Sequence, residues 1–320
     1  MNNSLLEIEN LYKYFHVKSG PGKTLTARAV DGVSLTVSKG EVIGLVGESG
    51  CGKSTLGRLA LGLMPATAGR VLFRGMDIST LPKEEMRRLR KEMQIIFQDP
   101  FASLNPRMRI QDIVSEPLVI HKLAEKSDLS DHTARLLEKV GLSRDSLQRY
   151  PHEFSGGQRQ RIGIARALAS NPSLIVADEP VSALDVSVQA QILNLLLDLQ
   201  ASLGLAILFI SHDLNIVRYF SDRVAVMYLG RIVEIAAAED IYRNPAHPYT
   251  EALLADIPVP DPSLKREHIL LKADIPSPAK IPQGCRFHTR CIYRFEPCDK
   301  AAPKTTHMGN GHLVECHLRG

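Results

Sequence analysis

The chain lacks the features that mark secreted, membrane-spanning or polyanion-binding proteins. Its first residues, MNNSLLEIEN, carry two acidic side chains and no basic ones, so they lack the basic start of a secretory signal. Its longest apolar runs, such as LAILFI at 205–210, are far shorter than the roughly 18 residues that a membrane helix needs. A net charge of +4 over 320 residues is too small to indicate a nucleic-acid partner. We therefore expect a cytoplasmic protein that serves any membrane from outside the bilayer.

Cysteine is scarce, and internal repeats are absent. Four of the five cysteines fall within the last 36 residues. In a reducing cytosol such a cluster indicates metal binding or redox chemistry more than structural disulfides. A proline-rich stretch at 257–283 predicts a linker or extended segment before the cysteines. We expect one large domain over 1–256 and a cysteine-containing extension over 257–320, a division that the chain length allows.

Hydrophobic patterning predicts an α/β fold. Residues 5–12 and 29–37 mix apolar and polar positions at short period, as in an N-terminal antiparallel β subdomain. From Glu41 onward, short apolar strands alternate with helical stretches, which indicates a mainly parallel sheet. The segment 99–168 is expected to form an inserted helical subdomain. The helix expected over 187–203 has one apolar stripe, formed by Ile192, Leu195, Leu196, Leu199 and Leu203.

A glycine-rich segment, GESGCGKST at 47–55, lies between an apolar strand and a helical stretch. It matches the pattern G-x-x-x-x-G-K-[ST], in which glycines let successive N–H groups turn toward phosphate oxygens at a helix start. Lys53 supplies a charge for the β and γ phosphates, Ser54 a hydroxyl for Mg²⁺, and Thr55 a contact near the α-phosphate. The thiol of Cys51 is expected to have no chemistry of its own. The predicted ATP-binding residues of the loop are Gly47, Ser49, Gly50, Cys51, Gly52, Lys53, Ser54 and Thr55.

Two consecutive carboxylates follow a buried strand in SLIVADEP at 173–180. Asp178 and Glu179 come at the carboxyl end of this strand, where parallel sheets bind ligands. We expect Asp178 to hold the Mg²⁺ shell and Glu179 to orient or deprotonate the attacking water, because phosphoryl transfer depends on positioning and charge neutralisation. In isolation the pair could be solvated loop charges or a helix cap, but the phosphate-loop pattern favours the catalytic interpretation.

A second anion-binding helix start is predicted in FSGGQRQR at 154–161, which opens with Ser155, Gly156 and Gly157. With this segment the sequence resembles the nucleotide-binding subunits of ATP-binding cassette (ABC) transporters over nearly the whole chain. Six motifs occur in the family's order: the loop at 47–55, Gln98 in IIFQDP, the signature Ser155, Gly156, Gly157 and Gln158, the acidic strand, SALD at 182–185, and His212 in FISHD. Phe154, where the family often has leucine, is a departure that leaves the signature intact.

The resemblance implies roles for residues outside the loop. Two such domains close head to tail, so that the signature of one grips the γ-phosphate held by the loop of the other. Gln98 would contact Mg²⁺ and the attacking water, Asp185 would link the two sites, and His212 would contact the γ-phosphate and hold the water. A lone histidine at a strand end is more often structural, and the family order is what favours a catalytic role here.

An aromatic position near the N-terminus completes the predicted ATP site. Phe15, in LYKYF, matches the family position that stacks on adenine. Tyr12 and Tyr14 are nearby alternatives, and an ordinary strand aromatic is a third interpretation.

Further stretches are similar to the ATPases of oligopeptide and dipeptide importers, and GESGCGKSTLGR is most similar to their F-type ATPase partner. This resemblance implies ATP and Mg²⁺ as ligands, and a heterodimer with a second, paralogous ATPase subunit. It also implies two transmembrane permease subunits, an extracytoplasmic substrate-binding protein that acts indirectly, and a peripheral location at the cytoplasmic face of the cell membrane. The surface near residues 99–106 is expected to receive the coupling helices of the permeases.

Other functions stay open on the sequence alone. Importers of nickel, glutathione or other small solutes share this ancestry, and the solute never touches the ATPase. A soluble ABC ATPase of translation or DNA repair usually has two cassettes or a long coiled-coil insertion, and the sequence has neither. A cluster-bearing regulatory or redox protein that uses ATP as a signal is a further alternative.

The four C-terminal cysteines have the spacing C-x5-C-x6-C-x17-C. Zinc ribbons usually carry close C-x2-C pairs, so zinc is disfavoured but stays as an alternative. Four thiolates also suit an iron–sulfur cluster, and the resemblance implies a [4Fe-4S] cluster held by Cys285, Cys291, Cys298 and Cys316. Unligated or disulfide-bonded cysteines are a third alternative. The candidate substitute ligands, each expected rather to be solvated, are His288, His312 and His317.

Overall fold

The computed structural model describes residues 4–18, 20, 24–257 and 274–320. Parts of the irregular stretch expected at 18–24, and most of the proline-rich segment expected at 257–283, lie outside the described residues. The chain divides into two compact units, and each is described by itself. Unit 1 consists of Met1–Leu5, Val37–Glu41 and Thr80–Ile210, and unit 2 of Leu6–Thr36, Val42–Ser79 and Ser211–Gly320.

Unit 1 contains three parallel strands. β6 (Met93–Ile96) pairs with β7 (Leu174–Asp178), and β7 pairs with β8 (Ala206–Ile210). Every residue of β7 and β8 is buried, as their unbroken apolar runs predict for strands covered on both faces. Helix α6 (Val186–Leu203) buries Ile192, Leu196 and Leu199. Leu203 is 38% exposed because it lies in the last turn before Gly204 ends the helix, so the apolar stripe is shorter than predicted.

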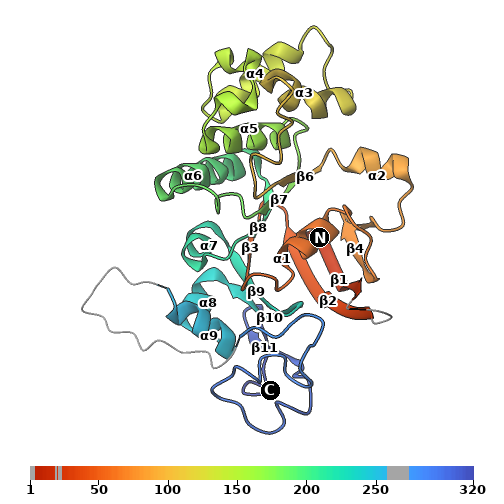
Figure 1. Ribbon diagram of the computed structural model, residues 1–320, viewed down its shortest axis with the longest axis vertical. Helices are drawn as coiled ribbons and strands as arrows, with labels where there is room; N and C mark the ends of the chain where they lie inside the picture. The colour runs from red at the N-terminus through yellow and green to blue at the C-terminus, as the bar shows by residue number, and fades with distance from the viewer. Residues whose placement is uncertain (1–3, 19, 21–23, 258–273) are drawn as a thin grey trace, which may run out of the picture. The chain divides into compact units, whose positions relative to one another are not determined.

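The helical insertion expected over 99–168 is present in unit 1. After α2 (Lys83–Leu89) and β6, the chain forms α3 (Ile110–Ile120), α4 (Leu129–Lys139), two 3₁₀ turns (Arg144–Gln148 and Pro151–Glu153) and α5 (Gly156–Leu168). Helices α3, α4 and α5 pack on one another, as the yellow and green ribbons show (Figure 1). Arginine side chains of α5 bond to the neighbouring backbone: Arg161 donates to Val140 O at the end of α4 at 2.7 Å, and Arg166 donates to Ser103 O before α3 at 2.7 Å.

Unit 2 contains an antiparallel sheet close to the N-terminus. β1 (Ser4–Lys18) lies between β2 (Thr24–Ser38) and β4 (Ala68–Phe73), and β5 (Met76–Asp77) pairs with β4. The antiparallel subdomain is therefore confirmed, although both long strands extend beyond the predicted ranges. Alternating burial in β2, from Asp31 to Val37, shows one face on the core and one face turned outward.

The other strands of unit 2 form a mixed sheet. β3 (Val42–Val46) pairs in parallel with β9 (Arg223–Tyr228), and β9 pairs antiparallel with β10 (Arg231–Ala237). β10 then pairs with β12 (His312–Glu315), and β12 with β11 (Thr305–Gly309). The C-terminal hairpin, which the sequence pattern did not predict, thus extends the sheet that leads into the phosphate loop.

Four helices accompany the described strands of unit 2: α1 (Lys53–Ala60), α7 (Leu214–Phe220), α8 (Ala238–Arg243) and α9 (Pro248–Ala255). α7 packs on β3, and α8 packs on β9, β10 and α7. None of the described helices combines the length and the apolar character needed to cross a membrane.

A buried carboxylate joins the C-terminal hairpin to the rest of unit 2. Glu234 of β10 is 1% exposed and accepts hydrogen bonds from Ala246 N at 2.6 Å, His247 N at 3.0 Å and His312 Nε2 at 2.8 Å. The expectation that His312 is solvated is therefore wrong. Pairing of β12 with β10 turns this side chain inward, where Glu234 is its partner.

Replacing Glu234 by alanine is expected to lower the free energy of unfolding by about 3 kcal/mol, because buried donors lose their acceptor. Urea unfolding of the purified chain measures this change. The control is Glu239→Ala, which removes an exposed pair with Arg243 and is expected to cost less than about 1 kcal/mol. Equal losses in the two variants would contradict the assignment of Glu234 as a buried anchor.

Candidate functional site

The phosphate-loop segment follows β3 and leads directly into α1. Gly47 and Gly52 have φ angles of +150° and +112°. An added Cβ would lie 2.1 Å from Met227 O at Gly47 and 2.0 Å from Ala29 O at Gly52. Glycine is required at both positions, since backbone oxygens occupy the space that any side chain would need. The turn ends at the start of α1, whose first N–H groups have no partner inside the helix and are suited to bind an anion.

Lys53 brings a positive charge into this loop. The side chain is 4% exposed, and its Nζ donates to Gly47 O at 2.7 Å and Glu48 O at 3.2 Å. Both acceptors are backbone carbonyls without a net charge, so the positive charge of the ammonium group is available to a phosphate. The other predicted loop residues lie on the same turn and in the first turn of α1: Ser49, Gly50, Ser54 and Thr55.

Cys51 is the buried thiol of the loop. Burial raises its pKa above the ordinary value, and the nearby Lys53 opposes this change only in part. The thiol is therefore neutral at physiological pH.

The acidic pair stands at the carboxyl end of β7 in unit 1. Asp178 is the last residue of the strand and is 3% exposed. Glu179 follows with a φ of +47°, a left-handed conformation that is uncommon for a residue with a side chain and frequent at functional sites. Its Oε2 accepts a hydrogen bond from Gln98 Nε2 at 2.9 Å, so the fold brings together two of the predicted catalytic residues.

The signature segment forms the start of α5. Ser155 Oγ accepts from Gln158 N at 3.3 Å, and Gln158 Oε1 accepts from Ser155 N at 3.0 Å, which is a reciprocal capping box. Ser155 itself is exposed. A Cβ on Gly157 would lie 2.4 Å from Val188 Cγ1, and one on Gly156 would lie 3.3 Å from Leu184 Cδ2. The two glycines thus allow α6 to approach the exposed N-terminus of α5.

Asp185 and His212 stand at the starts of helices. Asp185 is the exposed N-cap residue of α6 in unit 1. His212 is exposed and lies two residues after the end of β8, just before α7, in unit 2.

The aromatic residues of β1 differ in their contacts. Phe15 is 39% exposed, with Lys13 Nζ at 5.2 Å from its ring centre. Tyr14 instead donates its hydroxyl to Asp31, and burial together with this carboxylate raises the pKa of Tyr14 to about 12. Tyr12 packs edge-on against Tyr14, with ring centres 6.1 Å apart. Phe15 is therefore the exposed one of the three aromatic rings.

The C-terminal extension makes contacts with the loop region that the sequence pattern did not predict. Arg290 forms a two-pronged ion pair with Glu48, the residue after Gly47, at 2.6 and 3.0 Å. Arg286 pairs with Asp31 and donates to Leu229 O. Burial alone would raise the pKa of Asp31, but hydrogen bonds from Tyr14 and Arg286 lower it below the ordinary value. The signal available in the sequence was the pair of arginines inside CRFHTRC.

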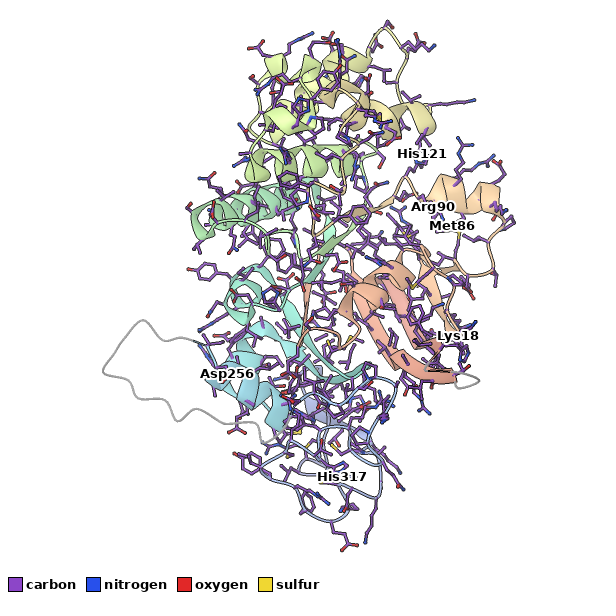
Figure 2. The ribbon with its side chains drawn as sticks, in the orientation of Figure 1. Lys18, Met86, Arg90, His121, Asp256 and His317 are labelled. Atoms are coloured by element: carbon purple, nitrogen blue, oxygen red, sulfur yellow. The ribbon has the colours of Figure 1, made fainter. Side chains whose placement is uncertain are left out.

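The same extension, which carries the labelled His317 (Figure 2), contains four free cysteines. Burial raises the pKa of Cys285 to about 11, and the charges of the other three C-terminal thiols raise it as well. Burial also raises the pKa values of Cys291 and Cys316; backbone hydrogen bonds oppose this change, and the negative charges of neighbouring thiolates add to it. The four residues Cys285, Cys291, Cys298 and Cys316 therefore form one electrostatically coupled set.

A single metal ion would require its ligand atoms to lie close together. Ligand sulfurs of a zinc site all lie about 2.3 Å from one ion and so within about 4.6 Å of one another. In the part of the chain that the structure describes, no three His, Cys, Asp or Glu side chains are grouped closely enough to hold one ion.

Each of the three candidate substitute histidines has an oxygen atom as a hydrogen-bond partner. His288 Nδ1 lies 2.8 Å from Cys285 O, His317 Nε2 lies 2.9 Å from Ala301 O, and His312 Nε2 is bonded to Glu234. One ring nitrogen of each histidine is thus engaged by an oxygen.

Two family models match the chain. The model described as ABC transporter matches residues 30–182, which include the loop, the signature and the acidic pair. The model described as Oligopeptide/dipeptide transporter, C-terminal region, matches residues 233–298, which include three of the four C-terminal cysteines.

Curated relatives match nearly the whole chain. The Oligopeptide transport ATP-binding protein AppF of Bacillus subtilis (strain 168) is 52% identical over 320 residues, which cover 98% of this chain and 97% of that protein. A putative peptide import ATP-binding protein of Brucella ovis is 53% identical over 312 residues, with coverages of 98% and 97%.

Solved structures of nucleotide-binding cassettes have the same fold. The dimeric post-hydrolysis state of the ATP-binding cassette MJ0796, bound to ADP and Pi, has a TM-score of 0.65 and 28% identity, and covers 73% of this chain and 98% of that chain. The structure of cbiO1 from Clostridium perfringens has a TM-score of 0.65 and 27% identity, with coverages of 76% and 92%. The predicted α/β fold with a phosphate loop is thereby confirmed.

Proposed function

Because this chain belongs to the ABC transporter family, we propose that it is the ATP-hydrolysing subunit of an importer that carries peptides across a membrane. The observation that carries the proposal is the phosphate loop, whose tight turn at Gly47 and Gly52 leads into α1 with Lys53 buried inside it. The peptide as cargo rests on the relatives, two of which are named for peptide or oligopeptide transport.

The proposed roles of the loop residues follow from their chemistry. Lys53 would neutralise the β and γ phosphates, and the N–H groups around Gly50 and Gly52 would bind their oxygens. Phe15 would stack on the adenine. Bound Mg²⁺, held by Ser54, Gln98 and Asp178, would neutralise charge that develops on the transferred phosphoryl group.

The proposed hydrolytic step depends on Glu179. Its carboxylate would orient the attacking water and accept its proton, with Gln98 fixing the carboxylate through the 2.9 Å hydrogen bond. His212 would contact the γ-phosphate and hold the water. The signature residues Ser155, Gly156, Gly157 and Gln158 and the D-loop residue Asp185 would serve the site of a second ATPase subunit, for which we propose a paralogue in a heterodimer.

Closure of this pair on ATP and its reopening after hydrolysis would drive the permease subunits. We propose contact with two such subunits through the surface near residues 99–106, a place at the cytoplasmic face of the membrane, and an indirect link to a substrate-binding protein. We also propose that the ATPase domain spans 1–256, with the helical subdomain about 99–168, and that 257–320 is the extension.

For the extension we propose a [4Fe-4S] cluster held by Cys285, Cys291, Cys298 and Cys316. Support comes from the four free cysteines of this extension, whose number equals the thiolate count of such a cluster. Thiolate ligation would supply a covalent cross-link between segments distant in sequence. Zinc is the alternative that metal analysis of the purified chain distinguishes.

Replacing Lys53 by alanine tests the proposed function. Loss of the buried charge is expected to weaken Mg·ATP binding by about 100-fold, because charge-assisted contacts to phosphate are among the stronger polar interactions. Titration with a fluorescent ATP analogue measures the dissociation constant. Lys83→Ala, in an exposed first turn of α2, is the control and is expected to bind like the parent. Unchanged affinity in Lys53→Ala would contradict the assignment of the loop as the ATP site.

A further inference from the structure

The segment CRFHTRC, residues 285–291, packs against the rest of unit 2 through three side chains. Arg286 reaches Asp31 and Leu229 O. Phe287 is 2% exposed and packs with its ring centre 5.4 Å from those of both Tyr228 and Tyr249. Arg290 is 5% exposed and is the third anchor, with Glu48 as its partner.

Glu48 is the residue of the phosphate loop on which these contacts converge. Its two carboxylate oxygens accept from Arg290 at 2.6 and 3.0 Å, and its backbone N donates to Tyr249 Oη at 2.9 Å. Its backbone O accepts from Lys53 Nζ at 3.2 Å. The side chain, the N–H group and the carbonyl of Glu48 thus each have a hydrogen-bond partner. The partner of the carbonyl is Lys53, the lysine proposed to bind the phosphates.

The negative charge of Glu48 affects phosphate binding by the loop. A carboxylate adjoining a loop that binds a triphosphate repels the ligand unless a cation neutralises it. A guanidinium fork that meets a carboxylate with two parallel hydrogen bonds neutralises the charge and also fixes its direction. Arg290 does both from a position 242 residues away in the chain.

We propose that Arg290 is a positioning residue of the ATP site: it neutralises Glu48 and, together with Tyr249, holds the phosphate loop in the shape that binds nucleotide. The inference rests on the proposed function, because it assumes that the loop binds ATP. This role of Arg290 gives the cysteine-bearing extension a function in nucleotide binding, since Arg290 immediately precedes Cys291.

The test is nucleotide affinity in the full-length chain. Arg290→Met is expected to raise the dissociation constant for a fluorescent ATP analogue about tenfold, which corresponds to about 1.4 kcal/mol. In ATPase assays the KM is expected to rise by a similar factor while kcat changes less than about twofold, because the variant leaves Gln98 and Glu179 untouched. The control is Arg294→Met, which removes an exposed pair with Asp299 in the same extension and is expected to bind like the parent.

A second variant separates positioning from a general effect on folding. Glu48→Gln removes the charge that Arg290 neutralises, so adding it to Arg290→Met is expected to restore at least half of the lost affinity on a logarithmic scale. A melting temperature and a metal content equal to the parent's show that the extension stays folded. If the double variant bound no better than Arg290→Met, or if Arg290→Met bound like the parent, the proposal would be overturned.

The Lys53→Ala variant distinguishes this failure from failure of the proposed function. If Lys53→Ala bound ATP like the parent, the assignment of the phosphate loop as the ATP site would be refuted. Weak binding in Lys53→Ala together with parent-like binding in Arg290→Met would leave the ATP site in place and refute the role of Arg290 alone.

Discussion

Replacing Glu179 by glutamine is expected to reduce ATP hydrolysis by about 10³-fold while ATP binding stays within about twofold of the parent. The amide has the shape of the carboxylate, and its oxygen still accepts the hydrogen bond that Gln98 donates to Glu179 at 2.9 Å. It lacks the basicity to take a proton from water. Phosphate release by the chain, assembled with its partner subunits, measures the rate, and titration with a fluorescent ATP analogue measures binding.

The matched control is Glu138→Gln, an exposed carboxylate of α4 in the same unit, which is expected to hydrolyse ATP at the parental rate. Normal hydrolysis by Glu179→Gln would show that another group activates the water. Joint loss of binding and hydrolysis would instead show that the left-handed backbone at Glu179 had been disturbed.

Elements with strong local signals were predictable from the sequence. β7 and β8 are unbroken apolar runs, and a strand with both faces buried requires such a run. The loop glycines were predictable because only glycine fits at Gly47 and Gly52, where an added Cβ would lie 2.1 and 2.0 Å from backbone oxygens. This requirement is visible in the sequence as glycines at fixed spacing. Local chemistry therefore accounts for the phosphate loop and the acidic strand.

Contacts between distant segments were not predictable in the same way. β11 and β12 become strands because β12 pairs with β10, and TTHMG and HLVE have little apolar alternation of their own. Arg290 and Glu48 are 242 residues apart in the chain, and the sequence around either residue does not indicate its partner. Long-range pairing, rather than propensity, decides these parts of the structure.

The C-terminal cysteines give the second large expected effect. Replacing Cys298 by serine is expected to abolish iron binding and to lower the free energy of unfolding by about 3 kcal/mol or more, because metal-binding free energy is folding free energy when ligands come from separate segments. Serine keeps the size of the side chain but is a poor ligand for iron. Iron and sulfide analysis with visible absorption, after anaerobic purification, measures the cluster, and thermal unfolding measures stability.

Cys51→Ser is the matched control for this prediction, since Cys51 is a buried thiol outside the coupled set, and it is expected to retain the iron content of the parent. A folded, colourless and iron-free parent would refute the cluster, and one equivalent of zinc in its place would favour the mononuclear alternative. The extension also places Arg290 beside Cys291, so loss of the cluster is expected to weaken ATP binding as Arg290→Met does. If Cys298→Ser lost its iron but bound nucleotide like the parent, the thiol set would serve stability alone, and Arg290 would hold Glu48 without help from the cluster.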